Sequence, residues 1–203
     1  MLQLLIVIDR GKTMKLGFDI DGVISDFVGS FVKVVKKHHG LTLTEADIYC
    51  HDLNLVLGIS KQEMNELIRE TLLSDLELMP KARRTLMRLE SEGHQILILT
   101  ARFKDLIDVT KTWLKNKGIP YSQLIQLNQG EKYLAEVELD LIVEDNLEDA
   151  LEWSQKIDNI LVYDHPWNQT LNVKGLIKRV HGWNEIFKEI QLLETKLSQK
   201  VHP

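Results

Sequence analysis

The chain has 203 residues, which suits one well-buried core with a small accessory domain and argues against two large domains. Hydrophobic residues make up 44% and charged residues 27%, which argues against disorder and a coiled coil. The net charge of −5, with its lysines and arginines spread out, gives no footprint for a nucleic-acid polymer. The single cysteine, Cys50, excludes an internal disulfide and predicts a reducing, cytoplasmic location. No apolar run approaches the roughly 20 residues that span a bilayer, so we expect no membrane partner.

The first fourteen residues allow two interpretations. Leu2–Ile8 is apolar and forms a candidate edge strand. Alternatively, Arg10–Thr13 can be encoded by a purine-rich stretch of the kind that recruits bacterial ribosomes, which makes Met14 a candidate translation start. The segment carries Asp9 and lacks a basic region and a cleavage site, so it is not typical of a signal peptide.

The first strand of the predicted core, Leu16–Ile20, runs into two aspartates and a glycine. Side chains two positions apart on a strand point to the same side, so Asp19 and Asp21 project together. Like charges this close favour a metal, a nucleophile with an acid–base partner, or both. Gly22 allows a sharp turn that leaves the strand end open to a ligand. An Asp-Gly turn with a stray acid is the alternative.

A long insertion separates the first two strands. Their carboxyl ends, Asp19 and Thr100, are 81 positions apart, whereas a strand-helix-strand crossover usually takes about 30 residues. Phe27–His39 has helical periodicity, Ser60–Leu73 opens with a capping box, and Thr44–Asp47 is a weaker box of the same type. The predicted organisation is a helical cap of residues 31–78 inserted into a core domain of residues 15–30 and 79–198.

Strand-like and helix-like segments alternate after the insertion, which is typical of a parallel sheet with helices on both faces. We predict an α/β fold with a Rossmann-like, five-stranded parallel sheet in the order 5-4-1-2-3. The later strands are expected at Gln95–Leu99, Leu124–Leu127, Asp140–Val143 and Asn159–Tyr163, and the later helices at 80–92, Asp105–Lys117, 146–156 and Asn184–Leu197.

Further polar residues are expected at the carboxyl edge of this sheet. Thr100 and Arg102 follow the second strand, where a hydroxyl and a guanidinium suit a phosphate group. Lys132 precedes the fourth strand, and Glu144 and Asp145 close it. Each signal alone is weak, because such a threonine is usually a helix cap, a lysine is usually solvated and two acids can begin a turn.

Taken in order, these motifs resemble those of the haloacid dehalogenase superfamily of phosphohydrolases. The resemblance covers residues 15–165 and consists of Asp-x-Asp-Gly, then a threonine, a lysine and an acidic pair. An aspartate at the second position, here Asp21, is typical of the phosphatases of this superfamily and not of its dehalogenases.

Within the superfamily, the sequence from Asp19 to Phe27 resembles the opening of the 5′(3′)-deoxyribonucleotidase family, whose members also carry a small helical cap at this place. The loop Tyr163–Asn168 is similar to a loop of bacterial members. The chain departs from the animal members in having Ala101-Arg102 instead of Ser-Pro, which affects substrate contacts. It also has Glu144 in place of an aspartate, which preserves the charge.

The resemblance implies a role for each motif residue. Asp19 would be the nucleophile that forms an aspartyl-phosphate, and Asp21 the general acid and then the general base. Thr100 would bind the phosphoryl oxygens, and Lys132 would neutralise developing charge. Mg²⁺ would be held by the Asp19 carboxylate, the Asp21 main-chain carbonyl, Asp145 and water.

Other residues keep alternatives open. Phe27 would stack on a nucleobase or pack the cap interior. Arg102 would bind the phosphate or a sugar hydroxyl, or pair with an acid on the surface. Glu144 and Asp149 are expected to support the ligands or cap a helix, with capping favoured for Asp149. His165 and Trp167 receive no role.

The sequence therefore predicts a Mg²⁺-dependent phosphatase acting on nucleoside monophosphates, with deoxynucleotides favoured. Its partner would be a small phosphomonoester and not a polymer. The alternatives are a phosphatase of phosphosugars or other small phosphomonoesters, and a non-catalytic protein that binds a phosphorylated ligand or a protein partner.

Overall fold

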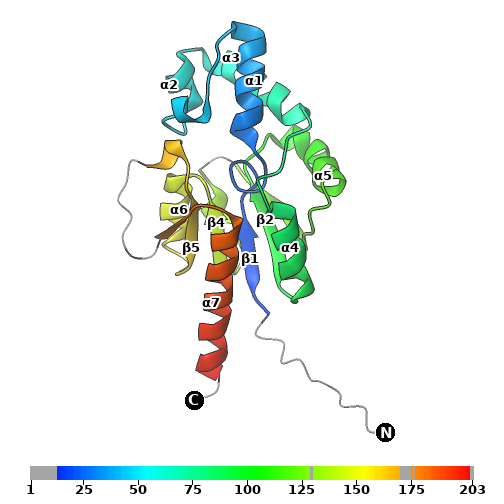
Figure 1. Ribbon diagram of the computed structural model, residues 1–203, viewed down its shortest axis with the longest axis vertical. Coiled ribbons are helices and arrows are strands. Elements are labelled where there is room, and N and C mark those ends of the chain that lie inside the picture. The colour runs from blue at the N-terminus through cyan, green and yellow to red at the C-terminus, as the bar shows by residue number, and fades with distance from the viewer. Residues whose placement is uncertain (1–12, 129, 170–174, 176, 202–203) are drawn as a thin grey trace.

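A computed structural model describes residues 13–128, 130–169, 175 and 177–201 of the chain. The strands of its sheet are β1 (Lys15–Phe18), β2 (Gln95–Thr100), β3 (Gln123–Gln126), β4 (Leu141–Glu144), β5 (Ile160–Tyr163) and β6 (Ile177–Val180). All pair in parallel, in the order β3-β2-β1-β4-β5-β6 (Figure 1). β1 thus lies in the interior of the sheet, between β2 and β4.

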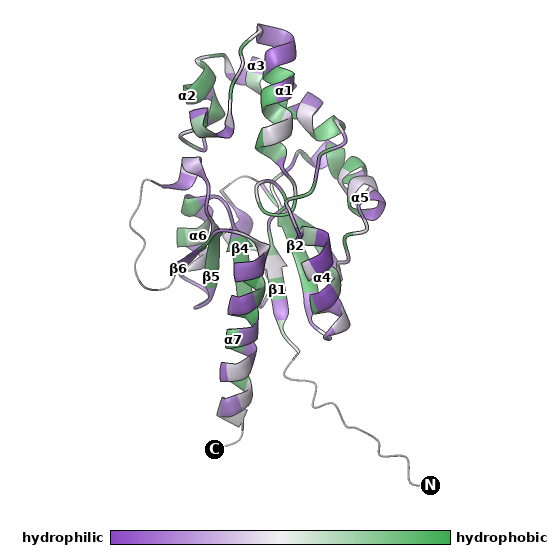
Figure 2. Cartoon of the chain, in the orientation of Figure 1, coloured by the Kyte–Doolittle hydropathy of each residue, from purple (hydrophilic) through white to green (hydrophobic). Residues whose placement is uncertain are grey.

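Helices cover both faces of the sheet. They are α4 (Ala82–Ser91), α5 (Ile107–Asn116), α6 (Leu147–Trp153) and α7 (Trp183–Val201). Successive strand side chains point to opposite faces, so each face builds its own core. Leu16 and Phe18 pack with apolar residues of α4, α5 and α7, whereas Leu97 and Ile142 pack with Trp153 of α6. Figure 2 shows mostly apolar residues in the strands β2, β4 and β5 and a mixture of polar and apolar residues along the helices.

Three further helices lie beyond the carboxyl ends of the strands (Figure 1). They are α1 (Phe27–His39), α2 (Leu53–Leu57) and α3 (Lys61–Leu73). Buried Phe31, Met64 and Leu67 give them a hydrophobic cluster of their own. Asp26 caps α1 by accepting the N–H of Gly29 at 2.9 Å, as a short polar side chain does at a helix start. We refer to these three helices and their connections as the cap; the bounds 31–78 remain a prediction.

The order of the five predicted strands is confirmed, but the number is wrong because the sheet has a sixth strand. β6 pairs with β5 at the edge of the sheet and has only four residues. Ile177 and Val180 are buried and Lys178 is exposed. A run this short, with two charged residues in its middle, has no apolar pattern that identifies a strand.

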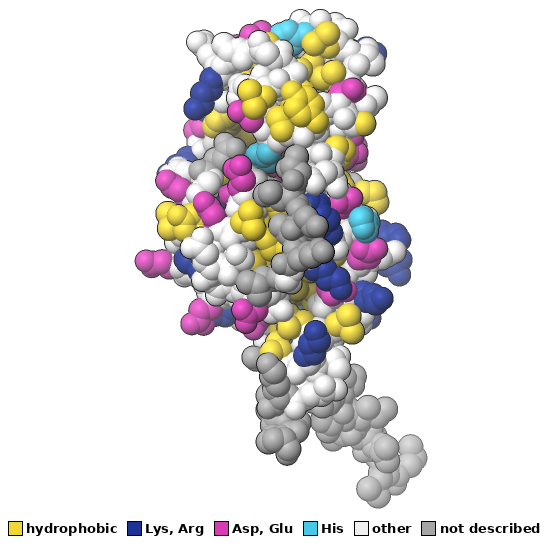
Figure 3. Space-filling model, turned by 90° about the vertical axis from the view of Figure 1, so that its left-hand side faces the viewer, with side chains coloured by type: hydrophobic (Ala, Val, Ile, Leu, Met, Phe, Trp, Pro, Cys, Tyr) yellow, Lys and Arg dark blue, Asp and Glu magenta, His cyan; other side chains and the backbone are white. Residues whose placement is uncertain are grey.

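The outer surface mixes charges. On the side shown in Figure 3, acidic and basic side chains both occur, so that side presents no field of one sign. No helix of the described residues is long and apolar enough to cross a membrane. The candidate edge strand Leu2–Ile8 lies outside the described residues. Met14 is buried, and its backbone carbonyl accepts the N–H of Gln95 at 2.8 Å, so it continues the pairing of β1 with β2.

Candidate active site

Polar residues predicted from the sequence meet at the carboxyl edge of the sheet. Asp19 directly follows β1, Thr100 ends β2, and Glu144 and Asp145 close β4. The N–H of Asp19 donates to the carbonyl of Val143 at 3.0 Å, which extends the ladder between β1 and β4 by one residue. All four polar side chains are buried. The predicted convergence of these residues is therefore present.

Lys132 enters the same site from the short 3₁₀ segment η3 (Lys132–Leu134). Its Nζ lies 2.9 Å from Asp19 Oδ1, 2.9 Å from Glu144 Oε2 and 3.4 Å from Asp149 Oδ2. Burial by itself lowers the pKa of Lys132, but the surrounding carboxylates, Asp19 foremost, outweigh it and hold that pKa well above its ordinary value. Lys132 is therefore a buried group whose charged form the surrounding carboxylates favour.

Three carboxyl groups surround Lys132, which has a single positive charge to balance them. Burial raises the pKa of Asp19 well above its ordinary value, although the charge of Lys132 opposes this. Burial likewise raises the pKa of Glu144 to about 7, again against Lys132. A second cation among these groups would reduce their mutual repulsion.

The cluster has the oxygens that a hard cation needs. Asp19, Glu144 and Asp145 each place one oxygen within 4.8 Å of the others. Both oxygens of Glu144 accept hydrogen bonds, from Lys132 and from Trp153 Nε1 at 3.2 Å. Asp19 offers one oxygen to Lys132, and Asp145 offers one to Trp167 Nε1 at 3.0 Å. Among the described contacts each aspartate keeps its second oxygen, so these two residues are the better candidates for metal ligands.

Gly22 lets the chain turn beside Asp145. Its φ of +83° lies in the left-handed region, and a Cβ at this position would stand 2.3 Å from Asp145 Oδ2. Its N–H donates to the carbonyl of Ser25 at 3.0 Å, which closes the turn. The sharp turn predicted after the acid pair is therefore present, and no other residue type fits there without displacing Asp145.

Asp21 is held by Arg102 rather than by Lys132. Arg102 donates from Nε and Nη2 to the two oxygens of Asp21, each at 2.7 Å, and Ser25 Oγ donates to Asp21 Oδ1 at 2.7 Å. Burial raises the pKa of Asp21, but the charge and hydrogen bonds of Arg102 outweigh it and hold that pKa below its ordinary value. Arg102 thus pairs with an acid, as one alternative expected, but inside the site and not on the surface. Its backbone N–H donates to Thr100 Oγ1 at 3.3 Å.

The expectation that Asp149 caps a helix is wrong. Asn146 is the N-cap residue of α6, and its Oδ1 accepts the N–H of Glu148 at 2.9 Å. Asp149 is buried and faces Lys132 instead. The spacing of Asn146 and Asp149 predicts a capping pair, and of the two only Asn146 caps the helix.

Phe27 begins α1, between the cap and the sheet. Its ring stacks on that of Phe31, with centroids 5.8 Å apart and planes 17° from parallel. It contacts hydrophobic clusters of both the cap and the core and is only partly buried. Both expectations for Phe27 therefore remain open.

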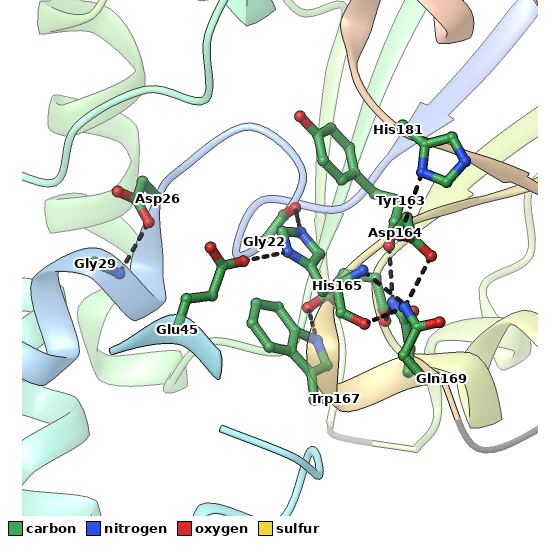
Figure 4. Close-up of polar contacts among 12 residues, drawn as sticks. Gly22, Asp26, Gly29, Glu45, Tyr163, Asp164, His165, Trp167, Gln169 and His181 are labelled. Carbon is green, nitrogen blue, oxygen red and sulfur yellow. Dashed lines mark hydrogen bonds and ion pairs between the residues drawn. The ribbon is translucent and has the colours of Figure 1, made fainter. Parts of the chain in front are cut away.

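No role was expected for His165 and Trp167 in the loop after β5, yet this loop contacts two parts of the site. Trp167 donates to the Asp145 carboxylate, and Asn168 Nδ2 donates to the Asp145 carbonyl at 2.8 Å. His165 Nε2 lies 2.7 Å from the carbonyl oxygen of Gly22 (Figure 4). These partners are far from the loop in the chain, and the only sequence signal for the loop is its resemblance to bacterial nucleotidases.

Comparison with known proteins gives consistent results. The model of a family described as "5' nucleotidase, deoxy (Pyrimidine), cytosolic type C protein" matches residues 12–197. A nucleotidase of Clostridium acetobutylicum is 27% identical over 190 residues, covering 91% of this chain and 97% of that protein.

Solved structures share the fold at low sequence identity. The structure of a predicted phosphatase from Clostridium acetobutylicum has a TM-score of 0.65 at 11% identity and covers 89% of this chain and 100% of its own. A HAD hydrolase of family IA, variant 3, from Entamoeba histolytica has a TM-score of 0.59 at 17% identity and covers 90% and 100%.

The family match takes in all the strands of the sheet, the cap helices and every residue of the site described above. The resemblance first seen in the Asp-x-Asp-Gly motif is thereby confirmed. This chain belongs to the family of cytosolic type C, deoxy (pyrimidine) 5′ nucleotidases, which are phosphomonoester hydrolases of the haloacid dehalogenase superfamily.

Proposed function

We propose that this protein is a cytoplasmic, Mg²⁺-dependent phosphatase that hydrolyses nucleoside monophosphates, with deoxynucleotides preferred, through an aspartyl-phosphate intermediate. The observation that carries the proposal is the buried Asp19 carboxylate at the carboxyl edge of the sheet. One of its oxygens forms an ion pair with Lys132, and Asp145 lies close by. Hydrolysis of phosphate monoesters is extremely slow without a catalyst, so a site for it has to supply both a nucleophile and charge neutralisation.

Asp19 is the nucleophile of the proposed reaction. Lys132 Nζ lies 2.9 Å from Oδ1 and orients the carboxylate, so that one of its oxygens can attack phosphorus. The new oxygen–phosphorus bond forms as the ester oxygen departs with the bonding pair. The charge of Lys132 and the hydroxyl of Thr100 then stabilise the phosphoryl oxygens.

Asp21 supplies and later removes the proton. In the structure it is paired with Arg102, which keeps it ionised. A phosphate dianion offers the guanidinium another planar array of acceptors. When Arg102 turns to the phosphate, Asp21 can take up a proton from solvent water and pass it to the leaving alkoxide. The same carboxylate then deprotonates the water that hydrolyses the aspartyl-phosphate.

The residues that would hold Mg²⁺ are Asp19, Asp145 and the main-chain carbonyl of Asp21. The acid cluster and the oxygens left on both aspartates support this assignment. When bound, the cation would screen the negative charge between Asp19 and the phosphoryl group.

The nucleotide preference rests on family membership and on Phe27. The family description names deoxy and pyrimidine 5′ nucleotides. Phe27 is a partly buried ring that contacts the hydrophobic clusters of both the cap and the core, and an aromatic ring of this kind can serve as a platform for a base.

A phosphate-release screen tests the proposal. Purified protein with Mg²⁺ would be offered deoxynucleoside and nucleoside monophosphates, phosphosugars and an aryl phosphate. We expect the fastest release from a deoxynucleoside monophosphate, none from Asp19→Asn, and a loss of about 10²–10⁴-fold in Asp21→Asn. Preference for a phosphosugar would move the assignment to that class. No release from any substrate would favour a binding protein, and substantial release by Asp19→Asn would contradict the covalent mechanism.

A further inference from the structure

His165 is a buried residue that has no role in the proposed chemistry. Its side chain is only 5% exposed, in the loop after β5. The imidazole lies between two aromatic rings: Trp167, with centroids 4.1 Å apart and planes 9° from parallel, and Tyr163, at 4.9 Å and 15°. This stack fixes the plane of the imidazole, so its two nitrogens have set directions (Figure 4).

The two nitrogens of His165 contact two distant segments of the chain. Nε2 lies 2.7 Å from the carbonyl oxygen of Gly22, and Nδ1 lies 2.9 Å from Glu45 Oε1. A carbonyl only accepts, so Nε2 carries a hydrogen. The contact of Nδ1 with Glu45 Oε1, at 2.9 Å, is within hydrogen-bond distance.

One contacted segment borders the candidate site, and the other belongs to the cap. Gly22 is the glycine with positive φ that follows Asp21 and passes against Asp145. Glu45 is the first residue of the 3₁₀ segment η1 (Glu45–Asp47) of the cap. Thr44 and Asp47 form a capping box at the start of this segment. The side chain of Glu45 is 56% exposed, so burial does not account for its position. His165, a residue of the core, therefore contacts both the cap, at Glu45, and the turn that follows the acid pair, at Gly22.

We propose that His165 is a positioning residue that holds the cap segment 44–48 against the turn after the acid pair, so that the cap stays in place over a bound substrate. The substrate part of this inference rests on the proposed function; the holding of the segment does not. If His165 merely fills space between Tyr163 and Trp167, its contact with Glu45 has no consequence for the cap.

The chain offers a matched control for the contact with Glu45. Glu70 of α3 also contacts a histidine, with Oε2 2.7 Å from His38 Nε2, and its Oε1 lies 2.7 Å from Lys37 Nζ. Both partners belong to α1, so this contact lies entirely within the cap. Glu70→Ala removes a glutamate–histidine pair without touching the connection between cap and core.

Hydrogen exchange measured by mass spectrometry tests the holding of the segment. We expect Glu45→Ala to speed amide exchange in residues 44–48 about two- to fivefold, as for a partly exposed ion pair. Glu45→Gln should restore slow exchange, because an amide can donate to Nδ1, and Glu70→Ala should leave the segment unchanged. His165→Phe keeps the aromatic stack and should speed exchange in residues 22–25 as well.

Steady-state kinetics test the consequence for substrate. Glu45→Ala should raise KM for a deoxynucleoside monophosphate by a similar factor with little change in kcat, and Glu45→Gln should restore KM. Exchange in residues 44–48 that is the same in Glu45→Ala as in the natural protein would overturn the proposal, as would equal impairment of Glu45→Gln and Glu45→Ala. Absence of phosphate release from every substrate would contradict the proposed function, whereas the exchange result would still decide the role of His165.

Discussion

Glu144 shows how strongly burial controls a single charge in this protein. The side chain is completely buried, and its two oxygens accept from Lys132 and Trp153. A buried ion pair recovers only part of the cost of removing both charges from water. The pKa of Glu144 rises to about 7 because burial outweighs the nearby Lys132. Glu144 thus positions Lys132, but burying its charged form lowers the stability of the folded protein, and the size of this loss depends on pH.

We expect a pH-dependent difference in stability between Glu144→Gln and the natural protein in the absence of metal. Between about pH 4.5 and 7 the folded protein keeps a proton on Glu144 that the unfolded chain releases, so this group makes folding less favourable as pH rises. The free energy of unfolding of the natural protein should therefore fall relative to that of Glu144→Gln by roughly 2–4 kcal/mol across this range. Urea unfolding at about pH 5 and about pH 8 measures it, and the same difference at both would contradict the raised pKa.

Only some of these residue positions could be predicted from the sequence. Asp19, Thr100 and Asp145 were predictable because the carboxyl ends of adjacent parallel strands meet at one edge. The contacts of Arg102 with Asp21 and of Asp149 with Lys132 were not predicted, because they depend on where long side chains lie in the packed site. No spacing rule anticipates them.

At the scale of elements, α1 is the cap helix that begins next to the sheet. Its first residue, Phe27, packs on Phe31 and contacts the hydrophobic clusters on both sides. The ring therefore has a structural role whether or not it also binds a base, so a single substitution does not separate the two roles. A second variant in the same stack is needed.

We expect Phe27→Ala to raise KM for a deoxynucleoside monophosphate by an amount equivalent to roughly 1–3 kcal/mol of stacking, with little effect on an aryl phosphate. The buried Phe31 provides the control, because Phe31→Leu should cost about 1 kcal/mol of stability without changing KM for either substrate. Steady-state kinetics and thermal unfolding measure both. Equal losses of Phe27→Ala on the two substrates would show that Phe27 only packs the cap.

The elements that the sequence predicted are those with a strong apolar pattern. α1 and α3 were predicted with their observed ends, since Asp26 and Ser60 cap them and their buried faces have helical spacing. β6 and α2 were missed because four or five residues at an edge or in a connection carry too little pattern.

At the scale of the whole molecule, the candidate metal site draws together segments that are far apart in the sequence. Asp19 follows β1, Asp145 follows β4, and Trp167 reaches Asp145 from the loop after β5. A ligand that binds only when these segments are assembled stabilises the folded chain as a whole. Metal binding should therefore be visible in global unfolding as well as in activity.

We expect saturating Mg²⁺ to raise the free energy of unfolding by about 2–3 kcal/mol at one hundred times its dissociation constant. Asp145→Asn should lose most of this increment, because an amide neutralises less of the charge on the cation. Chelation should abolish phosphate release and Mg²⁺ should restore it, whereas Ca²⁺ should support release poorly because its longer, looser coordination misplaces the nucleophile. Thermal unfolding with and without Mg²⁺ checks the first result, and an Mg²⁺ increment equal in Asp145→Asn would exclude Asp145 as a ligand.

The most direct test of the central claim is to trap phosphate on Asp19. Enzyme in excess over a deoxynucleoside monophosphate, with Mg²⁺, would be quenched in acid at early times, and the peptide that contains Asp19 would be weighed. We predict that this peptide transiently gains one phosphoryl group, that the gain disappears as phosphate is released, and that Asp19→Asn never shows it. Release of phosphate with no modified peptide at any time, or the same modification in Asp19→Asn, would contradict the account.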